Sequence, residues 1–507
     1  MTTRRAPIDM SDTAFRAAGH ALVDQIADWL AAMPEGPIVR DQAPSAIRDV
    51  LGADQALPPS GSADAGALLA DTAGLLFRHS LFNGHPRFFG YVTSSPAPIG
   101  ALADLLASAV NQNVGAWRLS PLATEIEAQT IRWIAELIGV PTDAGGLLVS
   151  GGNMANFVCF LAARAAKAPA GTRRAGLRSL PQPLRVYVST ETHTWIHKAA
   201  DLFGLGTDAI RWIPTDGDQR MDMTALQSQI LADRAAGGLP FLVVGTAGTV
   251  STGAVDPLAA IADVCRRHDL WFHVDGAYGA FAARVPGAPV DLQAMAMADS
   301  VAVDPHKWLY APLEAGCALV RRPAHLLQAF SYHPDYYHFD HDVTNYFDYG
   351  PQNSRGFRAL KVWLALRQAG ASGCLDMIGD DMRLSRRLHD SVSGHAELEA
   401  LSQHLSIATF RYVPLDLRPA SDPEAQKYIS RLNQELLSRI ERSGELFLSS
   451  AIVHGLFALR ACIVNFRTSE ADVDAIPAVI ARVGREVDAQ LRGVAEGAEG
   501  AGLTQKN

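Results

Sequence analysis

The 507-residue sequence has few cysteines, no long apolar run and no excess of basic charge. None of the cysteines belongs to a CxxC pair, which excludes a disulfide scaffold and a cysteine-rich zinc module and fits a reducing cytoplasm. The cysteines are Cys159, Cys265, Cys317, Cys374 and Cys462. No stretch approaches the roughly 20 apolar residues that cross a bilayer. The arginines near the N-terminus are not followed by an apolar run, so we expect no secretory signal.

Charge and composition place the chain in the globular class. The formal net charge is −9 and acidic and basic residues are mixed along the chain, so nothing indicates a basic surface for nucleic acid or lipid. Hydrophobic residues make up 48% and charged residues 19%, which is typical of a folded chain. At roughly 100–200 residues per domain, the length suits two to four domains. We expect a cytoplasmic enzyme without a membrane or nucleic-acid partner.

Residues 1–95 predict an N-terminal helical arm. Apolar side chains recur at helical spacing from Phe15 to Met33, after Ser11, a residue type that caps helices. Pro34 ends this helix. Because the apolar stripe has no partner within its own segment, we expect the arm to pack elsewhere, on a second subunit.

Residues 96–370 alternate short β-branched runs with helical stretches, which predicts an α/β fold with a mainly parallel sheet and helices on both faces. Most runs lack period-two alternation, as strands buried on both faces do. Ligands of such sheets bind beyond the carboxyl ends of the strands, so the chemistry should follow each run. The runs are Leu147–Ser150, Arg185–Thr190, Ala209–Pro214, Phe241–Gly245, Trp271–Val274, Ser300–Val303 and Cys317–Val320.

Three further segments complete the predicted organisation. Residues 329–357 are rich in tyrosine and have no apolar period, which indicates a long functional loop. Residues 371–490 predict a smaller C-terminal α+β domain, and residues 491–507 a flexible tail.

A candidate anion site follows the first run. Gly151, Gly152 and Asn153 lead into a helical stretch from Met154 to Lys167. A glycine turn at a helix N-terminus presents bare N–H groups and the positive end of the helix dipole to an anion. An ordinary tight turn has the same pattern, and neither a P-loop nor a GxGxxG dinucleotide motif is present.

Two charged residues also come directly after apolar strands. Asp275 follows the WFHV run and precedes small residues, so a carboxylate buried there needs a cation or a donor, although it can equally cap the next turn. Lys307 lies between a strand and Trp308. Most lysines are simply solvated, but desolvation here would favour the neutral amine, the form that attacks a carbonyl.

The histidines do not indicate a metal site. His193 and His197 are four residues apart, but Thr194 stands where the zinc-protease pattern requires glutamate, and no third ligand is nearby. Together, an anion cradle, a buried acid, a lysine for an aldehyde and a histidine that can stack on a flat ring are the parts that hold pyridoxal 5'-phosphate (PLP).

Eight segments extend this pattern along the chain: HPRFFGYV (85–92), SPLATEIE (120–127), LLVSGGNMANF (147–157), ETHTWIHKAA (191–200), GTAGTVSTGAVDP (245–257), WFHVDGAYG (271–279), ADSVAVDPHKWL (298–309) and SRGFRALKVW (354–363). In this order and spacing the chain resembles the group II PLP-dependent amino-acid decarboxylases, over roughly residues 10–480. This family includes the aromatic-L-amino-acid, histidine and glutamate decarboxylases. The resemblance implies the type I, aspartate-aminotransferase-like fold, and decarboxylation of an aromatic or related L-amino acid to an amine and CO2.

The resemblance also implies a role for each residue of the predicted site. Lys307 would bind the cofactor aldehyde covalently, Asp275 would pair with the pyridine nitrogen, and His193 would stack on the ring. The other implied cofactor contacts are Gly151, Gly152, Asn153, Thr246, Ala277, Asp304 and His306. Tyr332 would return a proton to the substrate, with Tyr336 and Tyr337 as neighbouring alternatives.

An obligate homodimer with active sites at the subunit interface is implied as well. Tyr91, Trp117 and Ser354 would line the substrate pocket. Val92 and Gly115 stand where the aromatic enzymes carry aromatic residues, so we expect a less aromatic pocket, larger or more polar. A serine at position 354 favours phenolic substrates.

Other reactions stay open at this stage. The same fold can run oxidative deamination to an aldehyde, against which Tyr332 and His193 argue. It can also run another type I PLP reaction such as transamination, against which the loop argues. A non-catalytic scaffold is disfavoured by Lys307 and Asp275.

Overall fold

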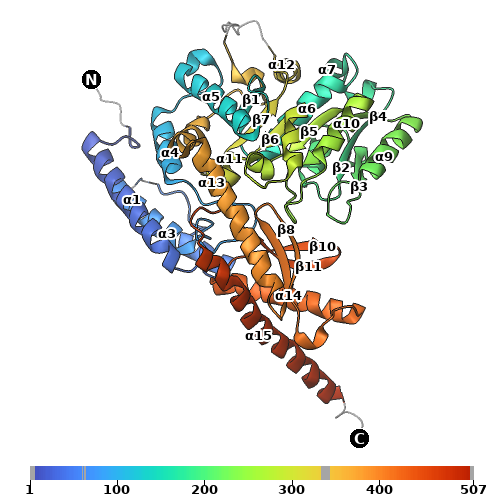
Figure 1. Ribbon diagram of the computed structural model, residues 1–507. Coiled ribbons are helices and arrows are strands. Elements are labelled where there is room, and N and C mark those ends of the chain that lie inside the picture. The colour runs from blue at the N-terminus through green and yellow to red at the C-terminus, as the bar shows by residue number, and fades with distance from the viewer. Residues whose placement is uncertain (1–5, 60, 62–63, 333–342, 503–507) are drawn as a thin grey trace.

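The computed structural model describes residues 6–59, 61, 64–332 and 343–502. Figure 1 shows a large domain, a smaller C-terminal domain below it, and N-terminal helices along one side. Within the described ranges, no helix combines the length and the apolar character that spanning a membrane requires.

The N-terminal arm is helical, as the spacing predicts. Its first helix begins after Ser11, whose hydroxyl accepts the N–H of Ala14. Trp29 stacks on Phe77 at 4.9 Å, which joins the first helix to the third, so the expectation that the apolar stripe has no partner within its own segment is wrong for this residue. The arm contains α1 (Asp12–Ala32), the 3-10 helix η1 (Met33–Glu35), α2 (Pro44–Leu51) and α3 (Ala65–His79).

The large domain is built on a seven-stranded sheet with the order β1-β7-β6-β5-β4-β2-β3. All seven predicted runs form strands, and only β7 runs antiparallel to the direction of the other six. The mainly parallel α/β fold is therefore confirmed. The strands are β1 (Gly145–Val149), β2 (Leu184–Ser189), β3 (Ile210–Ile213), β4 (Leu239–Thr246), β5 (Trp271–Asp275), β6 (Ser300–Val303) and β7 (Gly316–Val320).

Helices cover the sheet because its strands are apolar on both faces. Helix α6 packs on the central strands with α8 and α12 beside it, while α9 and α10 pack against β3, β4 and β5 and α5 packs against β1 and β7. The helices and 3-10 helices of this domain are α4 (Pro98–Val110), η2 (Trp117–Leu119), α5 (Pro121–Ile138), α6 (Gly152–Lys167), α7 (Thr172–Ala175), η3 (Leu177–Ser179), α8 (Trp195–Leu202), η4 (Thr207–Ala209), α9 (Met223–Ala235), α10 (Leu258–His268), η5 (Gly279–Ala282), η6 (Val290–Met297), α11 (Pro305–Trp308), α12 (Ala324–Phe330) and η7 (Tyr346–Asp348).

A long helix, α13 (Ala359–Ser393), links the two domains. It passes through residue 370, the expected end of the large domain, and kinks there at Gly370, which has a φ of 68°. The small domain has a four-stranded antiparallel sheet with the order β10-β11-β9-β8. Its elements are β8 (Leu398–His404), β9 (Ile407–Tyr412), η8 (Leu415–Leu417), α14 (Pro423–Ser443), β10 (Ser449–Val453), β11 (Leu456–Cys462) and α15 (Glu470–Gly502).

The last helix extends into the segment for which we expected a flexible tail. Residues 491–502 continue α15, and residues 503–507 lie outside the described part of the chain. Arg492 pairs with Asp416 at 2.8 Å and with Asp488 at 2.9 Å, so the helix is tied to the body of the small domain beyond residue 490.

Candidate active site

A cavity of about 240 Å³ lies where the carboxyl ends of the central strands meet α6. All the predicted cofactor residues except Gly151 line it, so residues that are far apart in the sequence converge as expected. The lining residues are Ser150, Gly152, Asn153, Asn156, Glu191, His193, Thr246, Gly248, Val250, Asp275, Ala277, Tyr278, Asp304, His306 and Lys307.

The glycine turn leaves the end of the cavity next to α6 open. Gly151 has a φ of 91°, a backbone conformation that favours glycine. A Cβ at Gly152 would lie 2.5 Å from Oδ2 of Asp304 and 3.2 Å from the Cβ of Ala277. Only glycine therefore lets the first turn of α6 come this close to the strand ends, with its unpaired N–H groups available to an anion.

The amine of Lys307 lies inside this cavity. Its Nζ is 3.2 Å from Oδ2 of Asp304, and the side chain is about one-fifth exposed. The neighbouring His306 donates from Nδ1 to the carbonyl oxygen of Ala315 at 2.8 Å. A carbonyl can only accept, so Nδ1 is the donor in this contact, which is the shorter of the two that it makes with the backbone of Ala315. The short helix α11, which begins at Pro305, holds both side chains.

The carboxylate of Asp275 is almost fully buried, with 6% of the residue exposed. Its Oδ2 accepts the indole N–H of Trp195 at 2.8 Å, and its Oδ1 accepts the backbone N–H of Ala277 at 3.2 Å. Two donors on different oxygens satisfy part of the buried charge and fix the orientation of the group.

His193 is one of the residues that line the cavity. Burial, with a smaller contribution from the positive charge of Lys307, lowers the pKa of His193 below its usual value and outweighs the opposite effect of Asp275. Its Nδ1 accepts the backbone N–H of Trp195 at 3.3 Å. The imidazole is therefore neutral near pH 7 with its proton on Nε2, which suits a flat group that packs on a ring.

The donor set fits PLP. Oγ1 of Thr246 and Oδ1 of Asp304 are buried in the cavity without a hydrogen-bond partner among the described residues, and a polar ligand would satisfy them. The glycine turn offers N–H groups to a phosphate, Lys307 an amine to an aldehyde, and Asp275 a carboxylate to a ring nitrogen. No cluster of three or more His, Cys, Asp or Glu residues within the described ranges is arranged to hold a metal ion.

Tyr332 is not brought to this cavity by its own chain. It is 70% exposed and lies in a separate hollow with Arg173 and Gln328. The guanidinium of Arg173 sits 4.1 Å from the tyrosine ring centroid, and its Nε donates to the hydroxyl at 3.2 Å. Tyr336 and Tyr337 fall outside the described residues.

The three predicted substrate residues do not line the cavity either. Tyr91 is 56% exposed and lies beside Phe447, and Trp117 donates from Nε1 to Glu125 at 2.8 Å. Ser354 is exposed. Their roles at the substrate stay predictions.

The sequence reasoning missed several lining residues. Glu191 follows β2, so the rule that ligands bind at strand ends could have found it; here it accepts a hydrogen bond from Ser251. Trp195 does not line the cavity but donates to Asp275, and it gave no signal, because a buried tryptophan at helical spacing is indistinguishable from a core residue in one sequence.

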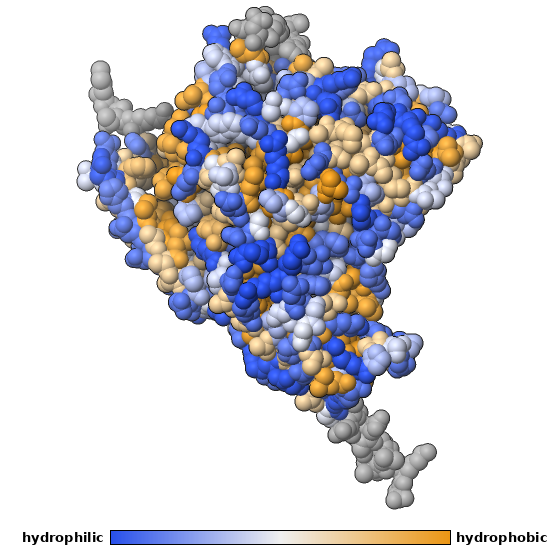
Figure 2. All heavy atoms as spheres, in the orientation of Figure 1, coloured by the Kyte–Doolittle hydropathy of each residue, from blue (hydrophilic) through white to orange (hydrophobic). Residues whose placement is uncertain are grey.

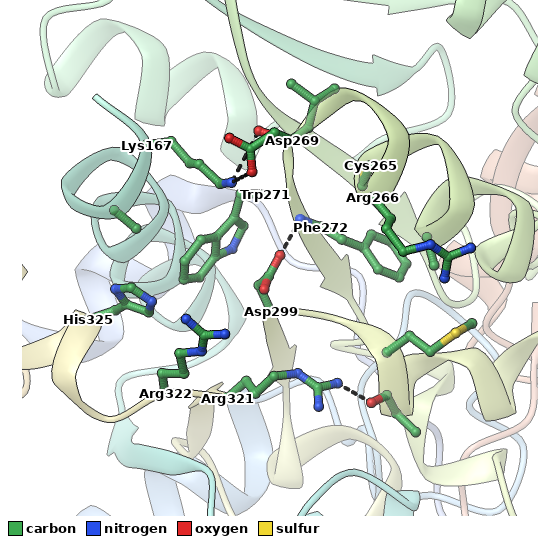
Figure 3. Close-up of a pocket in the computed structure, with 15 residues that line it drawn as sticks. Lys167, Cys265, Arg266, Asp269, Trp271, Phe272, Asp299, Arg321, Arg322 and His325 are labelled. Carbon is green, nitrogen blue, oxygen red and sulfur yellow. Dashed lines mark hydrogen bonds and ion pairs between the residues drawn. The ribbon is translucent and has the colours of Figure 1, made fainter. Parts of the chain in front are cut away.

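Besides the Lys307 cavity and the hollow around Tyr332, a larger hollow of about 660 Å³ lies at the opposite ends of the same strands, and we call it the second hollow. Figure 3 shows Trp271, which begins β5 there, whereas Asp275 ends β5 in the Lys307 cavity. Lys167 of this hollow is paired with Asp269 at 2.7 Å, and Arg321 donates to backbone carbonyls. The larger hollow is therefore remote from the candidate chemistry.

Comparisons with known proteins agree with this geometry. A family model described as "Pyridoxal-dependent decarboxylase conserved domain" matches residues 53–413. An aromatic-L-amino-acid decarboxylase from Bacillus atrophaeus is 32% identical, over 96% of this chain and 99% of that protein. A solved structure of Oryza sativa TDC with PLP and tryptamine is 29% identical, with a TM-score of 0.87 over 95% of this chain and 99% of that one. A Rhodiola rosea 4-hydroxyphenylacetaldehyde synthase is 27% identical, with a TM-score of 0.83 over 95% and 99%.

Proposed function

The chain belongs to the pyridoxal-dependent decarboxylase family, and we propose that the Lys307 cavity removes the carboxylate of an aromatic or related L-amino acid. PLP is the cofactor, and the products are the amine and CO2. The observation that carries the assignment is the convergence of one amine, one buried carboxylate and one glycine turn on a single cavity.

Each residue of the cavity has a task that follows from its place. Lys307 supplies the amine that holds the cofactor through its aldehyde, and Asp304 positions that amine. Asp275, held by two N–H groups, is the anionic partner of the ring nitrogen and keeps a proton on it. Neutral His193 packs on the ring. When bound, PLP supplies a ring that accepts the electrons released as the carboxylate leaves.

The proton that replaces the carboxylate comes in this proposal from Tyr332. Arg173 holds this tyrosine in a hollow of its own chain, away from Lys307 of the same chain. Proton donation by Tyr332 therefore takes place at the cavity of a partner subunit. Tyr336 and Tyr337 are the alternatives from the sequence.

The substrate pocket is less aromatic than in the named aromatic decarboxylases. A Cβ at Gly115 would lie 2.2 Å from the backbone oxygen of Asn353, so the packing excludes any side chain at this position. With Val92 at the other position where the aromatic enzymes carry an aromatic residue, the pocket accepts a substrate that is larger or more polar than a simple indole. Ser354 and the tyrosine decarboxylases among the relatives support a phenolic substrate.

A homodimer accounts for the N-terminal arm. No residue of α1 is buried within the chain, and large apolar side chains on α1, α3 and α4 are more than half exposed. They are Phe15, Leu68, Leu76, Leu102, Leu105, Leu106 and Val110. Figure 2 shows apolar side chains gathered on the side where α4 and these helices lie. A second copy covering this face would bury them.

Cytoplasmic placement is supported by five cysteines that are all free and buried.

The test uses PLP-loaded protein with the proteinogenic amino acids plus dopa and 5-hydroxytryptophan. Carbon dioxide, amine and aldehyde are followed together by mass spectrometry. We expect amine and carbon dioxide in equal amounts from one substrate. Aldehyde with ammonia and peroxide would instead assign the oxidative reaction.

Lysine variants test the site itself. Lys307→Ala should abolish both turnover and the visible absorption of the bound cofactor. Lys167→Ala is the matched control, because its side chain is 23% exposed against 21% for Lys307 but lies in the second hollow. Full activity in Lys307→Ala would refute the proposed function.

A further inference from the structure

Trp195 is in contact with two residues of the proposed cofactor site at once. It begins α8, two residues after His193, and its side chain is fully buried. Its indole N–H donates to Asp275 at 2.8 Å, and its backbone N–H donates to His193 at 3.3 Å. We propose that Trp195 is a positioning residue that fixes the carboxylate of Asp275 for the pyridine nitrogen of PLP. This inference rests on the proposed function.

The hydrogen bond to Asp275 is suited to this task. The indole N–H is a neutral donor that has no acceptor function, so it stabilises the ionised carboxylate more strongly than the protonated form. Trp195 acts on Oδ2 and Ala277 on Oδ1, and each oxygen keeps lone-pair capacity for a further partner. The carboxylate is thereby oriented and kept anionic without losing its capacity to pair with a protonated ring.

The packing of Trp195 makes the donor rigid. Its ring lies edge-on to Phe160, with centroids 6.4 Å apart, and to His273 at 5.8 Å. Because the surrounding core already fixes the indole, no side-chain freedom is lost when the cofactor binds. Phenylalanine at this position would keep most of the apolar packing and the backbone N–H to His193. It would remove the indole donor alone.

Trp271→Phe is the matched control for Trp195→Phe. Trp271 begins β5, the strand that ends at Asp275; it is 2% exposed, and its indole N–H donates to Ser300 at 2.8 Å. As Figure 3 shows, it lies by the second hollow. Both variants therefore lose one buried indole donor, but only Trp195→Phe loses a bond to Asp275.

The experiment measures three properties of each variant. They are the dissociation constant of PLP by equilibrium dialysis, the rise in Tm that PLP produces, and the absorption spectrum of the bound cofactor between pH 6 and 9. We expect Trp195→Phe to bind PLP at least about tenfold more weakly, as for a lost hydrogen bond to a charged group. Its spectrum should change with pH differently from wild type. Trp271→Phe should bind PLP within about twofold of wild type with an unchanged spectrum.

A third variant keeps the inference testable if the phenylalanine variant unfolds. Trp195→His restores a ring N–H, and we expect it to bind PLP more tightly than Trp195→Phe or to fold where that variant does not. Wild-type affinity and an unchanged spectrum in Trp195→Phe would overturn the inference and leave the proposed function standing. Wild-type protein that takes up no PLP would overturn both.

Discussion

The buried ion pair between Arg355 and Glu127 offers a quantitative test of the fold around the site. Arg355 is 3% exposed and Glu127 is fully buried. The guanidinium donates to both carboxylate oxygens of Glu127, to the carbonyl of Val114 at 2.8 Å and to the carbonyl of Leu148 at 2.7 Å. Glu127 also accepts the N–H of Leu148 at 2.8 Å. One pair thus connects α5, β1 and the loop that follows Ser354, next to the glycine turn.

The magnitude follows from what each substitution leaves behind. Arg355→Met keeps an apolar side chain of similar length but leaves the buried carboxylate of Glu127 with the single N–H donor of Leu148. Breaking a buried pair in this way costs about 3–5 kcal/mol of unfolding free energy. The double variant Arg355→Met/Glu127→Gln has no buried charge at either position, so we expect it to recover about 2 kcal/mol of that loss.

The assay is equilibrium urea unfolding of the PLP-loaded protein, followed by far-UV circular dichroism and by tryptophan fluorescence. Arg358→Met is the control, because Arg358 pairs with Glu314 at 2.7 Å in a partly exposed position where a pair contributes about 0–1 kcal/mol. The reasoning is refuted if Arg355→Met stays within about 1 kcal/mol of wild type, or if the double variant is less stable than Arg355→Met.

Three further perturbations test other parts of the molecule. Burial lowers the pKa of His273 to about 4. The stability that the neutral imidazole contributes is therefore present above pH 6.5, and about 3 kcal/mol of it is lost as the pH falls towards 4. In urea titrations, His273→Asn should show a weaker dependence of the unfolding free energy on pH over this range. Tyr332→Phe should lower kcat at least about 100-fold with little change in KM in steady-state assays, and unchanged kcat would pass the proton donor role to another residue of the loop. Gly152→Ala should weaken PLP binding at least about tenfold in equilibrium dialysis, because its Cβ would lie 2.5 Å from Asp304, whereas Gly373→Ala, within helix α13, should bind PLP as wild type does.

The sequence predicted the sheet and the convergence of most candidate cofactor residues on one cavity for one physical reason. Strands that are apolar on both faces are recognisable locally, and the residues that follow them must meet at one edge of a parallel sheet. This rule placed Asp275 and Lys307 at one edge of the sheet, and the family resemblance supplied their roles. Residues that act through distant contacts were missed or misplaced. Trp195 and Asp275 are far apart in the sequence, as are Tyr332 and Arg173. Only the tertiary fold brings the two members of each pair together.

Dependence on contacts that are distant in the sequence also explains why the pattern of residues 491–502 did not indicate a helix. Residues 491–502 have a composition rich in glycine and alanine that indicates a tail, but the ion pairs of Arg492 with Asp416 and Asp488 stabilise the helix beyond residue 490. These partners lie 76 and 4 residues away in the sequence. A local pattern contains only the second of them.

The polar residues on one face of β5 leave Asp275 without a cationic partner among the described core residues. Trp271, His273 and Asp275 alternate along the strand and point to the same side, because side chains two apart share a face. Trp271 donates to Ser300, and His273 is hydrogen-bonded between Ser300 and Asn156. His273 stays neutral in the fold, so it places no positive charge beside Asp275. The donors to Asp275 in the core, the indole of Trp195 and the backbone N–H of Ala277, are also neutral, so its one cationic partner in the proposed function is the protonated ring of the cofactor. A core that had neutralised Asp275 internally, with an arginine in place of Trp195, would be expected to bind the pyridinium more weakly, and Trp195→Arg would show this as a loss of PLP affinity larger than that of Trp195→Phe.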